Sequence, residues 1–163
     1  MKVKYLDLKN KRVFISGGGS GIGASIVEHF CEQNSEVYFI DIDVKASIRL
    51  INNIKKKNLR APKFIECNIL DIKKLQNTIK DIINKKGPIH CLINSAANDD
   101  RHTTEQVDEK YWENRMGINL KHYFFAAQSV VKGMKKIKSG SIVNLSSVSW
   151  VLGEGDKVVY ETA

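Results

Sequence analysis

The segment from residue 16 to residue 23 reads Ser-Gly-Gly-Gly-Ser-Gly-Ile-Gly, and its spacing suits a phosphate-binding loop. Positions 17, 21 and 23 fit GxxxGxG, and positions 19, 21 and 24 also fit GxGxxA. Glycine permits a tight turn and lacks the Cβ that would block a pyrophosphate. A glycine loop alone can be a structural turn, but a strand-like run before it and a helical pattern after it favour a dinucleotide site. The residues expected to hold the phosphates at the helix start are Gly17, Ser20, Gly21, Ile22 and Gly23.

An acidic side chain follows the next apolar run, about 20 residues beyond the loop. This residue, Asp41, can accept hydrogen bonds from the ribose hydroxyls of an adenosine. Its charge would repel a 2′-phosphate, and no arginine directly follows it, so NAD is the expected cofactor rather than NADP. The alternative is that Asp41 caps the following helix, although Asp43 is better placed for that task.

A possible proton-transfer group lies near the end of the chain, where Tyr160 follows Ser147 by thirteen residues. A free tyrosine has a pKa of about 10, so it is a poor base at neutral pH unless a nearby cation stabilises the phenolate. Taken singly, Tyr160 could be a surface aromatic, Ser147 a loop hydroxyl and Asn119 a helix-end residue. Their joint order and spacing make these separate explanations improbable.

The elements that must position these residues follow an alternating pattern of short apolar runs and longer amphipathic ones. The helical region within 104–137 has an apolar face through Leu120, Phe124, Ala127 and Val131. Repeated units of this kind predict an α/β fold, with a parallel sheet, right-handed crossovers and helices on both faces. Strands are expected over 12–16, 36–40, 63–67, 90–94 and 141–146, and helices over 22–33, 45–57, 72–85, within 104–137 and from residue 160 onward.

The composition fits one soluble domain, because 163 residues with 42% hydrophobic and 27% charged side chains can bury a single core. The net charge of +8 comes from lysines spread along the helical stretches, which favours solvated helix faces over a nucleic-acid patch. Three cysteines form no CxxC pair, so we expect reduced, mostly buried thiols, a cytoplasmic protein and no metal site. No apolar run reaches membrane-spanning length and no secretory signal is expected, so no membrane partner is predicted.

Three further motifs accompany the glycine loop and Tyr160: Asn-Ser-Ala-Ala at 94–97, Gly-Ile-Asn-Leu at 117–120 and Asn-Leu-Ser-Ser at 144–147. Together they resemble the short-chain dehydrogenase/reductase family over the whole chain. The resemblance implies a Rossmann-type doubly wound fold. The glycine spacing is similar to that of the simpler enzymes of the family rather than its extended, epimerase-like branch.

The resemblance also implies roles for individual residues. Tyr160 would take the proton of the substrate hydroxyl, Ser147 would bind the substrate oxygen, and Asn119 would anchor a water relay. The cofactor would also contact Asn68 and Ile69 at the adenine pocket and Asn94 and Ser95 after the fourth strand. Ser95 departs from the Asn-Asn of that motif and Ala97 departs from its usual glycine, which affects the placement of the ribose.

A finer resemblance, carried by residues 97–102, 111–112, 134–136 and 149–153, is to the aldose-oxidising members of the family. It implies oxidation of a D-xylose-like sugar at C1 to the lactone, with hydride passing to NAD. Asn98, Asp99, Arg101 and His102 could bind the sugar and Trp150 could stack on it; equally, Asp99 or Asp100 could pair with Arg101 in a salt-bridged loop. The alternatives are a dehydrogenase of another alcohol or ketone, and an NAD-binding fragment without turnover.

In the resembled family a lysine follows the tyrosine by four residues, and that position falls just after Ala163. We therefore expect residues 1–163 to be a single NAD-binding domain comprising the N-terminal two thirds of a longer one. Strands six and seven would be missing, and the chain as written would have little activity. The full-length form is expected to be a homo-oligomer, a dimer or a tetramer.

Overall fold

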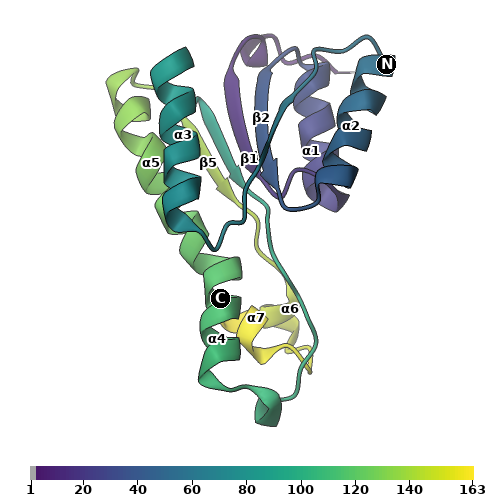
Figure 1. Cartoon of the computed structure of the whole chain (residues 1–163), viewed down its shortest axis with the longest axis vertical. Helices are drawn as coiled ribbons and strands as arrows, with labels where there is room; N and C mark the ends of the chain where they lie inside the picture. The colour runs from purple at the N-terminus through teal and green to yellow at the C-terminus, as the bar shows by residue number, and fades with distance from the viewer. Residues whose placement is uncertain (1–2) are drawn as a thin grey trace.

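A five-stranded parallel sheet forms the centre of the protein in the computed structural model, which describes residues 3–163 (Figure 1). The strand order is β3-β2-β1-β4-β5. This order reverses direction beside β1, as in doubly wound nucleotide-binding sheets, and it confirms the predicted fold class. The strands are β1 Arg12–Ser16, β2 Glu36–Asp41, β3 Lys63–Glu66, β4 Cys91–Asn94 and β5 Ser141–Asn144.

Alternate side chains of β1 enter two different cores, because successive residues of a strand point to opposite faces of the sheet. Val13 and Ile15 pack with Val27 of the helix that follows the glycine loop. Phe14 packs on the other face with side chains such as Leu75 and Val130. The sheet is therefore covered on both faces: α1 Gly21–Glu32 and α2 Val44–Lys56 lie on one side, and α3 Ile72–Lys86 and α5 His122–Lys136 on the other (Figure 1).

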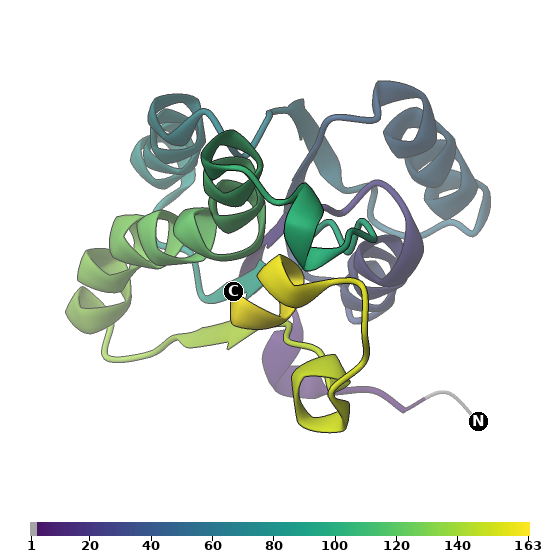
Figure 2. The ribbon, with the colours of Figure 1, turned by 90° about the horizontal axis from the view of Figure 1, so that it is seen from below.

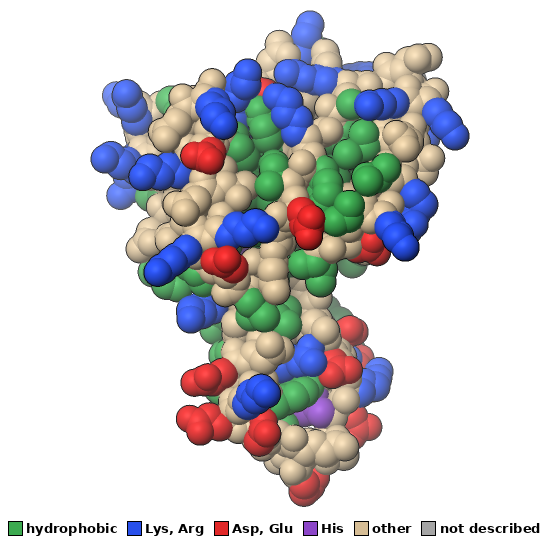
Figure 3. Space-filling model, viewed as in Figure 1, with side chains coloured by type: hydrophobic (Ala, Val, Ile, Leu, Met, Phe, Trp, Pro, Cys, Tyr) green, Lys and Arg blue, Asp and Glu red, His purple; other side chains and the backbone are tan. Residues whose placement is uncertain are grey.

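Helices α2 and α3 begin at aspartate caps, and helices α2, α3 and α5 end in lysines. Asp43 accepts a hydrogen bond from the N–H of Ala46 at 2.8 Å, which confirms it as the cap of α2, and Asp71 caps α3 in the same way. The last turns of α2, α3 and α5 carry paired lysines, where positive charge complements the helix dipole. All three helices run antiparallel to the strands, so lysines that are spread along the sequence gather at one end of the molecule (Figure 3).

One long helical segment contains a π turn. α4 Glu109–Met116 continues through the π-helical segment η3 Gly117–Lys121 into α5, and the short 3₁₀ turn η2 Thr104–Gln106 precedes it. The apolar face expected through Leu120, Phe124, Ala127 and Val131 is only partly buried: Leu120 and Phe124 are 44% and 64% exposed, whereas Ala127 packs against the core. Ala126 and Val130 are buried instead. The buried side of α5 is thus turned by about one residue from the expected face, which reaches the core only at its edge.

A small lobe lies beyond the carboxyl ends of the strands (Figure 1). It consists of α4 and of two short helices, α6 Ser149–Leu152 and α7 Val158–Thr162. β5 ends at Asn144, two residues earlier than the sequence suggested, and the chain from 145 to 148 leads directly into this lobe. Side chains from the lobe are thereby placed over the end of the sheet at which α/β proteins bind ligands.

Candidate active site

A cavity of about 710 Å³ opens at the carboxyl ends of the strands, the end of the sheet seen in Figure 2. It adjoins the glycine loop and the ends of β2, β3 and β4. All of the residues expected to bind the cofactor line it except Asn94: they are Gly17, Ser20, Gly21, Ile22, Gly23, Asp41, Asn68, Ile69 and Ser95. The predicted cofactor residues are therefore brought together in one place.

The glycine loop needs glycine at two positions for different reasons. Gly17 has a φ of +68°, and its N–H donates to the carbonyl of Ile40 at 2.9 Å, which folds the loop back over β2. A Cβ on Gly23 would lie 1.9 Å from the carbonyl oxygen of Gly17, so only glycine lets α1 approach the loop this closely. Ser20 precedes α1 with no side-chain cap bond, which leaves the first N–H groups of the helix for an anion. These features fit the pyrophosphate of a dinucleotide.

Asp41 holds the loop as well as facing the cavity. One carboxylate oxygen accepts the N–H of Gly19 at 2.8 Å, and the other accepts the N–H of Asp43 at 2.9 Å. Each oxygen retains a further lone pair for a ribose hydroxyl. The residues that line the cavity include three carboxylates, those of Asp41, Asp43 and Asp99, and no lysine or arginine.

Asn94 lies behind the cavity rather than in it. It is fully buried, and its Nδ2 donates to Oδ1 of Asn144 at 2.8 Å and to the carbonyl of Tyr123 at 3.4 Å. Asn94 and Asn144 are paired in register at the ends of β4 and β5, so the amide pair ties these strand ends together. Asn144 was missed from the sequence, although an asparagine at the end of both strands was the available signal.

A second cavity, of about 380 Å³, brings the three candidate catalytic residues together. Asn119 reaches it from η3, Ser147 from the loop after β5, and Tyr160 from α7. Tyr160 also lines the cofactor cavity, so its side chain lies where the two cavities adjoin. The residues that line both are Ala97, Tyr123, Leu145, Ser146 and Tyr160.

Main-chain and side-chain hydrogen bonds fix two of these three residues. Asn119 clamps the loop after β4 at two points: its Oδ1 accepts the N–H of Asn98 at 2.8 Å, and its Nδ2 donates to the carbonyl of Asn98 at 3.0 Å. The Oγ of Ser147 accepts the N–H of Ser149 at 3.1 Å and lies 2.9 Å from the Oγ of Ser149. Ser147 is thus held at the start of α6 with its hydroxyl beside the cavity.

Tyr123 is a second tyrosine at the junction of the cavities, and the sequence had not singled it out. Its hydroxyl donates to the carbonyl of Leu145 at 3.0 Å. Burial raises the pKa of Tyr123 to about 12, and the neighbouring charge of Tyr160 acts in the same direction. Tyr123 is therefore a neutral structural donor at physiological pH, unsuited to act as the base.

A buried histidine supports the floor of the cofactor cavity. The Oγ of Ser16 accepts the N–H groups of Ser95 and Ala96 at 3.1 and 3.3 Å and lies 3.4 Å from Nε2 of His122. Burial lowers the pKa of His122 to about 4, so its imidazole is neutral near pH 7. A neutral Nε2 can accept a hydrogen bond from the hydroxyl of Ser16. The lone pairs of the serine oxygen are then free to accept the N–H groups of Ser95 and Ala96.

The residues suggested for sugar binding are divided between places. Trp150 lines the second cavity, whereas Asn98 and Asp99 line the cofactor cavity. Asp100 forms an ion pair with Arg115 at 3.0 Å, so the alternative of a pair with Arg101 was wrong for this residue.

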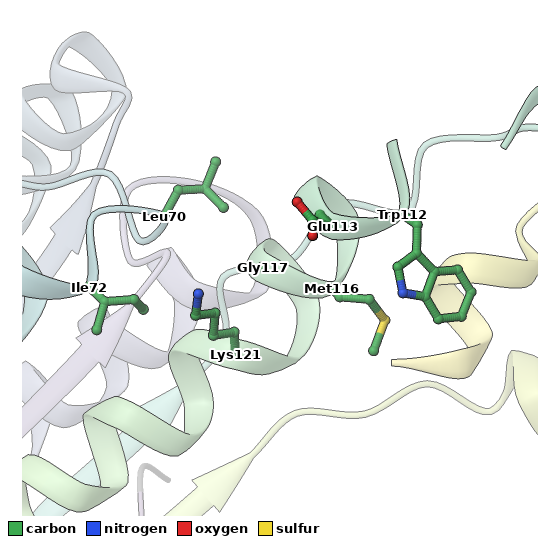
Figure 4. Close-up of a pocket in the computed structure, with 7 residues that line it drawn as sticks. All are labelled: Leu70, Ile72, Trp112, Glu113, Met116, Gly117 and Lys121. Carbon is green, nitrogen blue, oxygen red and sulfur yellow. The ribbon is translucent and has the colours of Figure 1, made fainter. Parts of the chain in front are cut away.

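A third cavity, of about 340 Å³, lies between the start of α3 and the α4–η3 segment (Figure 4). Its walls include Leu70, Trp112 and Lys121, and no candidate catalytic or cofactor residue lines it.

Two of the three cysteines, Cys31 and Cys67, are buried as expected, and Cys91 is half-buried. The described part of the chain holds no group of three acidic, histidine or cysteine side chains arranged for a metal ion. Within residues 3–163, no helix has both the length and the apolar character needed to cross a membrane.

Known proteins are similar to this chain in sequence and in fold. Residues 11–163 match the family described as short chain dehydrogenase. D-xylose 1-dehydrogenase of Caulobacter vibrioides is 40% identical over 159 residues, which are 98% of this chain and 62% of that protein. The probable galactose dehydrogenase GalD of Rhizobium meliloti is 36% identical over 160 residues, again 98% of this chain and 62% of the relative.

A solved structure agrees with the sequence comparisons. The ligand-free aldohexose dehydrogenase of Thermoplasma acidophilum superimposes with a TM-score of 0.83 at 26% identity, covering 97% of this chain and 57% of that one. The chain thus spans about 62% of the length of the curated relatives named above. With the glycine loop, the strand order and the family match over residues 11–163, the chain belongs to the short-chain dehydrogenase family.

Proposed function

We propose that this chain carries the cofactor and reacting sites of an NAD-dependent dehydrogenase that oxidises an aldose at C1 to the lactone. The observation that carries the proposal is the position of Tyr160, which lines both the cavity of the glycine loop and the cavity that contains Ser147 and Asn119. A group in this position can reach a substrate held against a nicotinamide. The names of the relatives, which include a xylose, a galactose and an aldohexose dehydrogenase, support a sugar as the substrate.

The chemistry assigns one task to each residue. The residues of the glycine-loop cavity would hold the dinucleotide, whose nicotinamide would supply the hydride acceptor for C1 of the sugar. Tyr160 is the general base that takes the proton of the C1 hydroxyl, and the Oγ of Ser147 donates a hydrogen bond to the same oxygen. Asn119 fixes the main chain of Asn98, which lines the cofactor cavity, and would anchor a water relay through which the proton leaves. The indole of Trp150, which is 64% exposed and lines the second cavity, offers an apolar face for the sugar ring.

A substrate panel tests the function. The protein, purified as its own cell makes it, is assayed at 340 nm with NAD and NADP against D-xylose, D-galactose, D-glucose and L-arabinose, with secondary alcohols and hydroxysteroids as the comparison set. We expect NAD reduction with at least one aldose at a kcat/KM roughly 100-fold above that of any alcohol, because fixed polar partners discriminate strongly between substrates. Turnover of an alcohol but of no aldose would support the alternative of a dehydrogenase for another alcohol or ketone. NAD binding without any turnover would support the alternative of an NAD-binding fragment without activity.

The carboxylate of Asp41 is proposed to select NAD. We expect Asp41→Asn to raise the ratio of kcat/KM for NADP over NAD by about tenfold, since the change removes a charge close to the adenosine ribose while keeping the side-chain size. Steady-state kinetics with both cofactors measure this ratio. Asp71→Asn is the matched control, because Asp71 caps a helix away from the cavity lining and its loss should leave the ratio unchanged. An unchanged ratio in Asp41→Asn would show that another feature selects the cofactor.

A further inference from the structure

His102 is a buried imidazole to which the proposed reaction gives no role. It stands in the loop after β4, only 6% exposed, with its ring against that of Tyr111 at a centroid separation of 4.9 Å. It lines neither the cofactor cavity nor the second cavity. A buried polar ring of this kind requires partners, and its partners lie on three different segments.

The imidazole bonds on both sides. Its Nε2 accepts the main-chain N–H of Val159 at 3.1 Å. Its Nδ1 lies 2.9 Å from the carbonyl of Asp100 and 2.8 Å from the hydroxyl of Tyr111. In addition, the main-chain N–H of His102 donates to the carbonyl of Asp156 at 2.7 Å. Because the partner of Nε2 is a donor, the imidazole must be neutral with its proton on Nδ1.

Val159 belongs to the first turn of α7, the helix that carries Tyr160. The first N–H groups of a helix have no partner within it and are normally satisfied by a capping side chain. Lys157, at the N-cap of α7, makes no side-chain cap bond. His102 therefore provides the cap from a distant part of the sequence. This contact ties the first turn of α7 to the loop after β4.

The same loop is held at its other end by a candidate catalytic residue. Asn119 clamps Asn98 through two hydrogen bonds, and His102, four residues later, holds the residue that precedes Tyr160. The loop from 98 to 102 thus connects the segment of Asn119 to the helix of Tyr160. Accordingly, we propose that His102 is a positioning residue that sets the phenol of Tyr160 against substrate and cofactor. This inference rests on the proposed function for the role of Tyr160, but the contact itself can be tested without turnover.

Two substitutions distinguish the hydrogen bond from Val159 to Nε2 from the contacts that Nδ1 makes. In His102→Gln the terminal amide reaches the place of Nε2, so its oxygen can still accept the N–H of Val159. In His102→Asn the amide reaches only the place of Nδ1, so the contacts with Asp100 and Tyr111 can persist while the cap is lost. We expect His102→Asn to lower kcat by about tenfold or more with KM for NAD changed less than about threefold, because misplacing a reacting group costs up to roughly 100-fold. His102→Gln should stay within about threefold of the unchanged protein.

Amide hydrogen exchange provides the readout that does not need activity. The peptide over 157–163 should exchange faster in His102→Asn and at the unchanged rate in His102→Gln, whether or not any sugar is oxidised. If His102→Asn does not fold, His102→Ser, which also lacks an acceptor at the place of Nε2, takes its place in the comparison. The proposal would be overturned if the 157–163 peptide exchanged at the same rate in all three proteins. It would also be overturned if kcat fell equally in His102→Asn and His102→Gln. Failure of the sugar panel with the expected exchange pattern would overturn the proposed function alone.

Discussion

Replacing Tyr160 by phenylalanine is expected to lower kcat by about 10³-fold while the dissociation constant for NAD changes by less than about threefold. The phenol of Tyr160 lies where the two cavities adjoin and can transfer a proton, and phenylalanine removes only its hydroxyl while retaining the ring. A general base contributes roughly 10²–10⁴-fold to a reaction of this kind. Single-turnover reduction of NAD at 340 nm and a fluorescence titration with NADH measure the two quantities separately.

Tyr123→Phe is the matched control for this experiment. Tyr123 lines the same two cavities, but its hydroxyl is committed to the carbonyl of Leu145 and burial raises its pKa to about 12. Removing this hydroxyl should cost less than about tenfold in kcat, since only one neutral hydrogen bond is lost. If the two variants were equally impaired, the tyrosines would share a structural role and Tyr160 would not be the base.

Gly23→Ala is expected to weaken NAD binding by more than about 100-fold and to destabilise the fold by about 2 kcal/mol. The added Cβ would lie 1.9 Å from the carbonyl oxygen of Gly17, which is backbone and cannot turn away as a flexible side chain can. The loop must move, and the amides at the start of α1 move with it. A calorimetric titration with NAD and a urea unfolding curve check the two effects.

Gly155→Ala serves as the control for adding a methyl group. Its Cβ would have no described atom within 4 Å, so both NAD affinity and stability should remain unchanged. A Gly23→Ala protein that binds NAD as tightly as the unchanged protein would contradict the assignment of this loop to the pyrophosphate. Loss of stability without loss of affinity would show that the loop packs on the helix but does not hold the cofactor.

Much of the cofactor half could be predicted because its signals are local. A strand, a glycine loop and a helix follow one another within 12–32, and the cap of α2 is the aspartate nearest to the helix start. The alternation of strand-like and helical runs predicted a parallel sheet, and ligands of such sheets lie at the carboxyl ends of the strands. The convergence of Ser147 and Tyr160 was also anticipated, although through a resemblance and not through periodicity.

The parts that could not be predicted depend on contacts between distant segments. Asn94 was placed among the cofactor residues, whereas its pairing with Asn144 became visible only when β4 and β5 were side by side. His102 gave no helical or strand pattern, and its partner Val159 is remote in sequence. Neither the π turn at η3 nor the exposed side of α5 can be read from a regular helical period.

The π turn also bears on how the length of the chain can change. A π turn accommodates one residue more than the α-helix around it, and each residue of an α-helix advances by roughly 100° about its axis. Deleting a single residue within 117–121 would therefore restore an α turn and leave α4 and α5 in nearly the same relative orientation. Deleting a residue in the regular first turn of α5 would instead turn α4 by about 100° relative to the rest of α5, and Tyr111 and Arg115 would leave the neighbourhood of His102 and Asp100. Changes of one residue in length should therefore be tolerated better at the π turn than in the regular helix on either side of it.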